Sequence, residues 1–360
     1  MPIFAAALLV CGNTSCVHTA SVPSGVLSNQ ILTFENTMVH TYPLRFENNL
    51  VTTIWGGSHL KPLKGMKADG ELIGESWEVS DVAGHVSVVR NGILAGHTLD
   101  EVIHRWGPAL LGQRIYKKYR GKCPLLVKLI DAAHDLSIQV HPDDALAAKR
   151  HGTLGKTEMW YVLSAEPGST LLTGFREALS ADDYSRRVAD GTIVDAMARH
   201  SVQPGDVFFI PAGRVHAICG GIVVCEIQQS SDITYRLWDY GRMGFDGRPR
   251  ELHVELARDA IDFGVYADYR TRYEPAKGAT TLVDCPCFVA SLLQVENSLE
   301  RRLSVHDSCV TLTCIEGVVR IVASGDKVAE LPTGASCLIP AVDADYRIEG
   351  RARLLEAWAR

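Results

Sequence analysis

The stretch SIQVHPDD, residues 137–144, places an amide and an imidazole where a strand would be expected to carry aliphatic side chains. Gln139 and His141 alternate with Ile138 and Val140. Because successive side chains of a strand point to opposite faces, Gln139 and His141 would share one face. Two polar groups on a face turned to the core are either hydrogen-bonded there or directed at something bound there.

A second imidazole and a carboxylate follow in two further motifs. Glu158 lies in GKTEMWYVL, just ahead of an apolar strand, and His216 lies near the end of PGDVFFIPAGRVHAI. In the latter segment Gly205, Pro211, Gly213 and His216 fit the pattern G-x5-P-x-G-x2-H. The glycines and the proline suit a tight turn that presents the histidine inward, and the pattern resembles the second sequence motif of the cupin barrels.

These motifs together predict a metal site. Two imidazoles, a carboxylate and an amide oxygen suit a borderline divalent ion such as zinc, with positions open for water or substrate. A single histidine on a strand is more often a satisfied core residue, and a single glutamate is more often a surface charge, but the four-position turn motif favours the metal site. The predicted ligands are Gln139, His141, Glu158 and His216.

The elements that would position these residues are mostly strands. Residues 125–142 have strand character, and the chain from about 280 onward reads as many short strands separated by Gly and Pro turns. Helical spacing is found in two insertions, about 98–120 and 178–200, and in residues 250–264. The predicted fold class is therefore mostly β, with two cupin-type jelly-roll barrels and helical insertions.

A weak internal repeat supports two barrels. Residues 202–218 and 330–348 each carry a Pro, a Gly, an apolar strand and Ile-Pro-Ala, but the second copy lacks the histidine of the first. We expect a catalytic cupin domain over residues 39–270 and a degenerate cupin-like domain, without catalysis, over 271–360. Residues 1–38 are expected to be a disordered extension or to precede the true start of the protein.

Composition narrows the class of partner. The chain has 36 basic and 42 acidic residues, a formal net charge of -6 and no marked run of Lys and Arg, so nucleic acid is not an expected partner. A membrane is not an expected partner either, because no stretch of the sequence reads as transmembrane. Its nine-residue apolar stretch near the N-terminus is too short to span a bilayer. The 10 cysteines lack paired CxxC motifs and lie mostly in aliphatic runs, which is typical of free thiols in a reducing cytoplasm.

Four motifs in order carry a family resemblance. SIQVHPDD, GKTEMWYVL, PAGRVHAI and QQSSDITYRLWDYGR resemble the type I mannose-6-phosphate isomerases (phosphomannose isomerases) in their shorter bacterial form, a family of the cupin superfamily. The resemblance covers roughly residues 42–358. It implies one Zn²⁺ per chain held by the four predicted ligands. The implied reaction interconverts mannose 6-phosphate and fructose 6-phosphate through a cis-enediol.

The same resemblance assigns roles to further residues. Arg236 matches the family's catalytic arginine, and Lys156 matches a lysine that handles protons or assists ring opening. A guanidinium is always charged and could stabilise an enediolate. Lys128 and Ser137 match positions that contact the substrate phosphate, and a cation and a hydroxyl suit phosphate oxygens. The general base is left open.

Each of these roles has a structural alternative. Arg236 could form a structural ion pair with Asp232 or Asp239, and Lys128 and Ser137 could be ordinary edge or surface residues. The carboxylates of Glu75 and Glu78 are expected to pack or to form a pocket wall. The remaining histidines, His253 among them, have no spacing that indicates a role.

Other functions stay open at this point. Two histidines and a carboxylate in a jelly roll also suit a non-haem iron oxygenase, although glutamine as a fourth ligand leaves less room for oxygen chemistry. A cupin that binds a sugar or a metal without catalysis is a second alternative, and an isomerase for another aldose phosphate is a third. The oligomeric state is not predicted.

Overall fold

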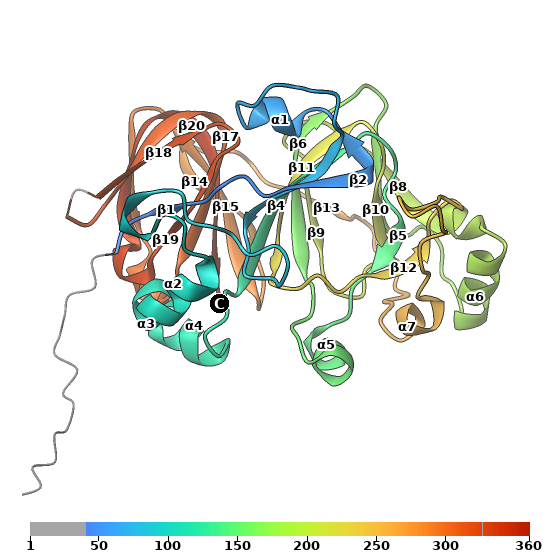
Figure 1. Cartoon of the computed structure of the whole chain (residues 1–360). Coiled ribbons are helices and arrows are strands. Elements are labelled where there is room, and N and C mark those ends of the chain that lie inside the picture. The colour runs from blue at the N-terminus through green and yellow to red at the C-terminus, as the bar shows by residue number, and fades with distance from the viewer. Residues whose placement is uncertain (1–40, 326) are drawn as a thin grey trace, which may run out of the picture. The chain divides into compact units, whose positions relative to one another are not determined.

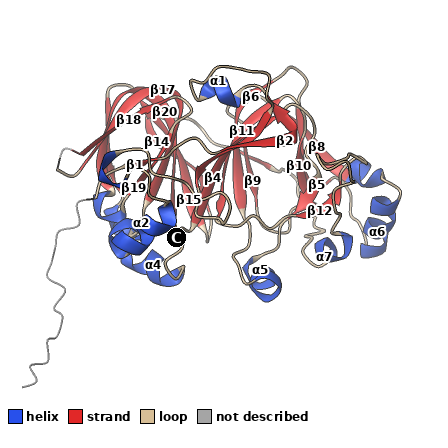
Figure 2. Ribbon diagram, viewed as in Figure 1, coloured by secondary structure: helices blue, strands red, loops and turns tan. Residues whose placement is uncertain are grey.

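The computed structural model describes residues 41–325 and 327–360. The predictions for residues 1–38 lie outside this part of the chain. The described residues form a mostly β structure of antiparallel sheets with short helices at their edges (Figure 1 and Figure 2), so the predicted fold class is confirmed.

Two sheets form the part of the structure that carries the metal-site motifs. In sheet order, the strands of the seven-stranded sheet are β13 (Arg270–Thr271), β9 (Val207–Ile210), β6 (Glu158–Ala165), β11 (Ile222–Gln229), β4 (Leu125–Ala132), β2 (Leu50–Gly57) and β3 (Ile73–Val79). Those of the five-stranded sheet are β12 (Tyr235–Trp238), β5 (Ile138–Val140), β10 (His216–Ile218), β7 (Thr170–Phe175) and β8 (Met197–Ser201).

Side-chain alternation turns one face of each of these sheets toward the other. On β4, Ile130 joins an apolar cluster between the two sheets, whereas Val127 and Leu129 join a cluster on the outer face. Ile218 on β10 belongs to the inner cluster, while Ala217 faces outward. The polar residues at matching inward positions therefore meet inside the pair of sheets.

Helices cover the outer face of the five-stranded sheet. These helices are α6 (Ala181–Ala189) and α7 (Val254–Arg258), and α5 (Asp144–His151) contacts α7 through Arg150. Ser180 and Asp183 form a capping box that starts α6. Tyr184 of α6 and Ala257 of α7 pack against Val140 in one cluster.

Two helices are shorter than the sequence predicted. The helical prediction for 178–200 is wrong beyond residue 189, because Gly191 adopts φ of 77° and the chain continues as a 3₁₀ turn (Thr192–Ala196) and β8. The helix predicted over 250–264 is limited to α7. Beyond it, the backbone N–H of Asp262 donates to the carbonyl oxygen of Gly213, which draws the chain away from the helix axis.

The third sheet has eight strands and is built mainly from the C-terminal residues. Its path is β1 (Leu44–Arg45), β19 (Ser336–Ile339), β17 (Val310–Ala323), β20 (Asp345–Ala359), β15 (Phe288–Val295) and β14 (Gly278–Asp284), with β16 (Ser298–Arg302) beside β20 and β18 (Lys327–Pro332) beside β17. The strands predicted beyond residue 280 are thus present. Strand β1 pairs with β19, so the start of the described chain is part of the C-terminal sheet.

The remaining helices lie in the first part of the chain. They are α1 (Leu60–Leu63), α2 (Leu99–Trp106), α3 (Pro108–Leu111) and α4 (Gln113–Lys118), with a 3₁₀ turn at Gly92–Leu94. Two more 3₁₀ turns, Ser304–His306 and Ala341–Asp343, lie in the C-terminal part. Residues of α2 to α4, of β4 and of β15 share one apolar cluster. This shared core joins the seven-stranded and eight-stranded sheets, and the division at residues 270 and 271 stays a prediction.

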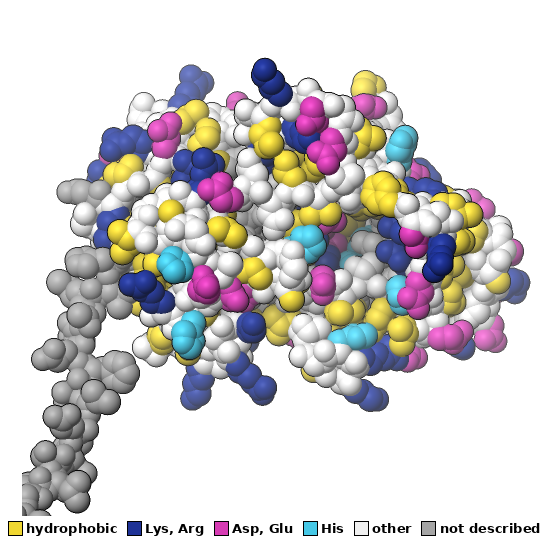
Figure 3. All heavy atoms as spheres, viewed as in Figure 1, with side chains coloured by type: hydrophobic (Ala, Val, Ile, Leu, Met, Phe, Trp, Pro, Cys, Tyr) yellow, Lys and Arg dark blue, Asp and Glu magenta, His cyan; other side chains and the backbone are white. Residues whose placement is uncertain are grey.

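The surface shows no strong segregation of charge in the view of Figure 3, where acidic, basic and histidine side chains are interspersed. Among residues 41–325 and 327–360, no helix is both long and apolar enough to cross a membrane.

Candidate metal centre and active site

Three of the predicted metal ligands converge between the two sheets. His141 follows β5, Glu158 begins β6 and His216 begins β10. One possible ligand atom from each of the three lies within 4.8 Å of the others, and all three residues are buried. Gln139 pairs directly with His216 across the antiparallel strands β5 and β10. The i, i+2 spacing of Gln139 and His141 therefore directs both side chains to the same interior.

Backbone carbonyls orient both imidazoles. The Nδ1–H of His141 donates to the carbonyl oxygen of Ile233 at 2.9 Å, and the Nδ1–H of His216 donates to that of Arg214 at 2.8 Å. Since a carbonyl only accepts, the Nε2 lone pairs are left for the interior. Burial lowers the pKa of His216 to about 3 and the pKa of His141 well below its usual value. Both rings are therefore neutral, as metal ligation requires.

The oxygen donors complete a set that fits a divalent cation. Glu158 Oε1 is buried and has no hydrogen-bond partner among the described residues, and it lies 3.3 Å from His216 Nε2. The side-chain amide of Gln139 lies 3.3 Å from the same nitrogen and can turn its oxygen inward by a flip. An orphaned carboxylate oxygen facing two imidazole lone pairs fits a zinc-type ion.

Lys156 lies directly beside this donor set. Its Nζ is 3.2 Å from His141 Nε2, contacts the Glu158 carboxylate, and is 3.7 Å from Glu226 Oε1. Burial acts to lower the pKa of Lys156, but the charges of Glu158 and Glu226 outweigh it and the pKa is raised. Glu226 also accepts a 2.8 Å hydrogen bond from the Trp160 indole. A lysine and a second carboxylate are thus held at fixed positions next to the predicted metal ligands.

A cavity of about 360 Å³ lies against these residues. Its walls include Glu75, Trp77, Lys128, Ser137, Gln139, Lys156, Glu226, Asp232, Thr234, Arg236, Arg250 and His253. This volume is in the range of small-ligand sites. The cavity contains every residue predicted for catalysis or phosphate contact.

Arg236 lies on β12 directly opposite Gln139 of β5. Its Nε donates to Ser137 Oγ at 3.3 Å, and its Nη1 donates to the carbonyl oxygen of Glu251 at 2.9 Å. In the described part of the chain, Arg236 forms no ion pair with Asp232 or Asp239, so the structural alternative considered for it is wrong. Its charge is available at the cavity wall.

Lys128 faces the same cavity from β4. Its Nζ is 3.4 Å from Glu75 Oε2 and 3.8 Å from the centre of the Trp77 ring. Because Lys128 is buried, the interpretation as an ordinary surface residue is wrong. Ser137 is also buried, and it accepts the hydrogen bond from Arg236.

The sequence did not indicate three residues that line the cavity. Glu226 is a carboxylate that follows the apolar run Ile222–Cys225 on the buried strand β11, and this was the one available signal. Arg250 reaches the cavity while paired with the buried Asp239, which also binds Arg242. His253, to which no role was given, accepts a hydrogen bond from the Arg236 backbone at 3.1 Å.

The glutamates of GESWEVS lie at different sites. Glu75 lines the cavity beside Lys128, whereas Glu78 points to the other face of β3 and pairs with Lys64. Glu75 and Glu78 therefore each line a cavity, as expected of a pocket wall, but they line two different cavities.

A pair of facing antiparallel sheets with a His–Glu–His set in its interior is the arrangement of a cupin-type metal centre. Comparisons with known proteins define it further. Residues 44–168 match the family model for the phosphomannose isomerase type I catalytic domain, and residues 278–357 match that for the mannose-6-phosphate isomerase cupin domain. The chain belongs to the type I mannose-6-phosphate isomerase family, whose members are metal-dependent aldose–ketose isomerases.

Individual relatives match over nearly their whole length. Mannose-6-phosphate isomerase of Streptococcus mutans is 34% identical over 317 residues, covering 87% of this chain and 97% of the relative. A mannose-6-phosphate isomerase of Bacillus subtilis is 33% identical over 321 residues, covering 88% and 98%. The crystal structure of the Bacillus subtilis enzyme superimposes with a TM-score of 0.79 at 31% identity, covering 88% of this chain and 99% of that one.

Proposed function

We propose that this protein interconverts mannose 6-phosphate and fructose 6-phosphate with one Zn²⁺ per chain. The observation that carries the proposal is the buried His141–Glu158–His216 set, which lies beside a cavity holding Lys156 and Arg236. The relatives named above as mannose-6-phosphate isomerases support the choice of substrate.

Gln139, His141, Glu158 and His216 would hold the ion. A zinc ion bound by them supplies Lewis acidity, which stabilises negative charge that develops on the oxygens of C1 and C2 during isomerisation. The neutral imidazoles and the Glu158 Oε1 atom, which has no hydrogen-bond partner among the described residues, support this assignment because they offer three unused donor atoms to one ion.

Proton movement is assigned to the groups next to the ligands. Isomerisation moves one proton between C1 and C2 and another between the two oxygens. Lys156 and Glu226 are within 3.7 Å of each other and both reach the cavity, so a proton can be held or passed between them. We assign Lys156 to proton transfer at the substrate oxygens, with Glu226 as its partner.

The cationic wall would hold the anionic parts of the substrate. Arg236 lies across β5 from Gln139, so its guanidinium is placed to stabilise an enediolate next to the metal site. Lys128 and Ser137, with Arg250, offer an ammonium, a hydroxyl and a second guanidinium for the phosphate. Binding energy from the phosphate, which does not react, would then position C1 and C2.

Another aldose phosphate would use the same groups, because sugar epimers differ only in the hydroxyls that the cavity walls contact.

A cytoplasmic location is part of the proposal. It is supported by eight free cysteines among the described residues, since such thiols persist in a reducing compartment.

A coupled assay on mannose 6-phosphate tests the proposal. We expect activity that is lost with EDTA, returns with zinc, and is absent from His216→Ala. His104→Ala, which changes an exposed histidine of α2, is the matched control and should keep full activity. If the metal-loaded protein turns over another aldose phosphate but not mannose 6-phosphate, the substrate assignment is wrong and the site assignment stands.

A further inference from the structure

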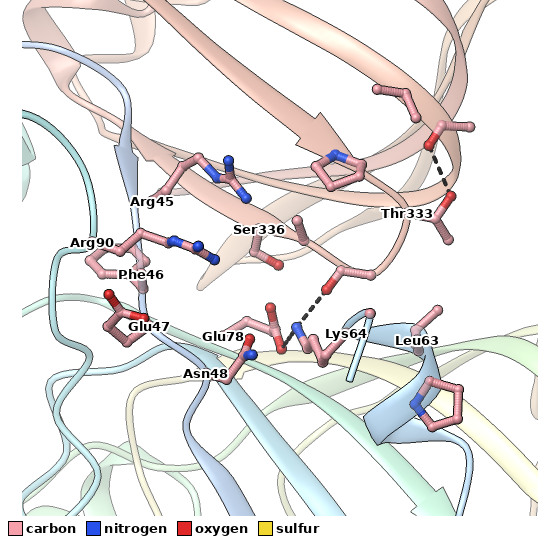
Figure 4. Close-up of a pocket in the computed structure, with 17 residues that line it drawn as sticks. Arg45, Phe46, Glu47, Asn48, Leu63, Lys64, Glu78, Arg90, Thr333 and Ser336 are labelled. Carbon is pink, nitrogen blue, oxygen red and sulfur yellow. Dashed lines mark hydrogen bonds and ion pairs between the residues drawn. The ribbon is translucent and has the colours of Figure 1, made fainter. Parts of the chain in front are cut away.

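A second cavity, of about 430 Å³, lies on the other side of β3 from the metal centre. It is bounded by the residues that follow β1, by the end of α1 and by the C-terminal sheet (Figure 4). Its polar lining includes Arg45, Lys64, Glu78, Arg90 and Ser336. None of these residues lines the cavity at the metal centre.

Two arginines face this cavity side by side. Phe46 and Val89 form an antiparallel bridge, and the backbone N–H of Arg90 donates to the carbonyl oxygen of Arg45 at 2.8 Å, so the arginines are close neighbours across the two segments. Figure 4 shows both guanidinium groups extending toward the space in front of Ser336 and Glu78. Like charges placed opposite each other are destabilising unless an anion lies between them.

No acidic side chain of the described residues forms an ion pair with either of these arginines. Neither Arg45 nor Arg90 has an ion pair within residues 41–325 and 327–360. Glu78 is held by Lys64, and Glu47 is exposed at the edge of the cavity. Burial, and after it the charge of Arg90, lower the pKa of Arg45, and the charge of Glu330, which acts in the opposite direction, does not outweigh them.

The rest of the lining suits the organic part of a small molecule. Phe46, Leu63 and Pro332 provide apolar surface, and Ser336 provides a hydroxyl that shares a 2.9 Å hydrogen bond with Thr313. Guanidinium forks match the oxygens of carboxylate and phosphate groups, and of the two only a phosphate carries enough charge to balance both arginines. A volume of about 430 Å³ accommodates a phosphate with a sugar-sized body.

Strand β3 separates this cavity from the metal centre. Glu75 and Trp77 line the metal-side cavity, and Glu78 lines the second one, because alternate side chains of a strand point to opposite faces. A ligand in the second cavity would therefore not occupy the substrate site.

We propose that the cavity between β3 and the C-terminal sheet is a second binding site, for a small phosphorylated metabolite whose phosphate is held by Arg45 and Arg90. This proposal does not depend on the reaction at the metal centre. Its phosphate contacts come from residues that contribute nothing to the substrate cavity.

Calorimetric titration with inorganic phosphate, at constant ionic strength, tests the proposal in an Arg250→Ser background. This change removes a guanidinium assigned to the substrate phosphate and leaves Asp239 paired with Arg242. We expect this variant to bind one phosphate per chain. Adding Arg90→Ser should weaken that binding by about tenfold or more, as the loss of a charge-assisted hydrogen bond predicts. Arg90 is exposed, so the substitution should leave the fold intact.

Arg320→Ser is the matched control, because it removes an exposed arginine of the C-terminal sheet outside the cavity. It should leave phosphate binding unchanged. Arg90→Ser alone should keep wild-type turnover of mannose 6-phosphate. Phosphate binding that is unaffected by Arg90→Ser, or absent from the Arg250→Ser background, would overturn the second site. A wild-type chain inactive on mannose 6-phosphate would count against the proposed function only.

Discussion

Lys156→Met should destabilise the protein strongly when zinc is absent and much less when zinc is bound. The Lys156 side chain is 5% exposed and its partner Glu158 is 0% exposed. Removing one member of a buried ion pair costs about 3–5 kcal/mol, because the remaining charge is left uncompensated in a medium of low dielectric. Zinc bound at the same carboxylate restores a positive charge there. With zinc bound, we therefore expect Lys156→Met to lower the free energy of unfolding by less than about 2 kcal/mol.

Urea unfolding followed by tryptophan fluorescence, with EDTA and with added zinc, measures both losses in free energy of unfolding. Trp160 is buried beside the site and reports on its unfolding. Lys277→Met, which breaks an exposed ion pair with Glu296, is the control and should change neither value measurably. Equal losses with and without zinc would refute the idea that Lys156 and the metal balance the same carboxylate.

Three further outcomes are expected from the site. Glu226→Gln should lower kcat by about tenfold or more without changing zinc content, because Glu226 assists proton transfer. A loss of zinc in proportion to the loss of kcat would instead make Glu226 a metal ligand. Asp239→Asn should raise KM for mannose 6-phosphate about tenfold, with a smaller change in kcat, because Asp239 holds Arg250 at the cavity wall; an unchanged KM would exclude this positioning role. Burial acts to raise the pKa of Asp239, but Arg250 and Arg242 outweigh it and the pKa is lowered. The stability that this carboxylate contributes should therefore be complete above about pH 4 and should disappear as the pH falls below its folded-state pKa. The urea midpoints of wild type and Asp239→Asn should accordingly differ at pH 7 and become equal in acid.

The inward orientation of Gln139, His141 and His216 could be predicted because it depends on local geometry. Strand alternation alone places Gln139 and His141 on one face. The turn that presents His216 requires Gly213, which has φ of 90° and leaves no room for a side chain, as a Cβ would lie 2.9 Å from the Ala260 carbonyl oxygen. Such requirements are visible in a single sequence.

The rest of the site depends on contacts between distant segments. Glu226 becomes significant only because β11 pairs with β6, which brings its carboxylate to Lys156. Arg250 reaches the cavity because Asp239, eleven residues earlier, holds it. Neither contact has a spacing rule that a sequence reveals.

Errors in the predicted elements have the same origin. Periodicity predicted a long helix over 250–264, but a hydrogen bond from Asp262 to the loop at Gly213 ends it early. Strand β1 pairs with β19, almost three hundred residues later, and no local pattern in Leu44–Arg45 indicates that partner. Tertiary contacts override local preference in both places.

The most direct test of the account combines metal content and turnover in one preparation. Zinc per chain is measured by mass spectrometry, and conversion of mannose 6-phosphate to fructose 6-phosphate is followed by NMR on the same sample. We predict one zinc per chain, conversion to equilibrium, and parallel loss of both in His216→Ala. A chain that forms fructose 6-phosphate at full rate after its metal has been removed would contradict the central claim.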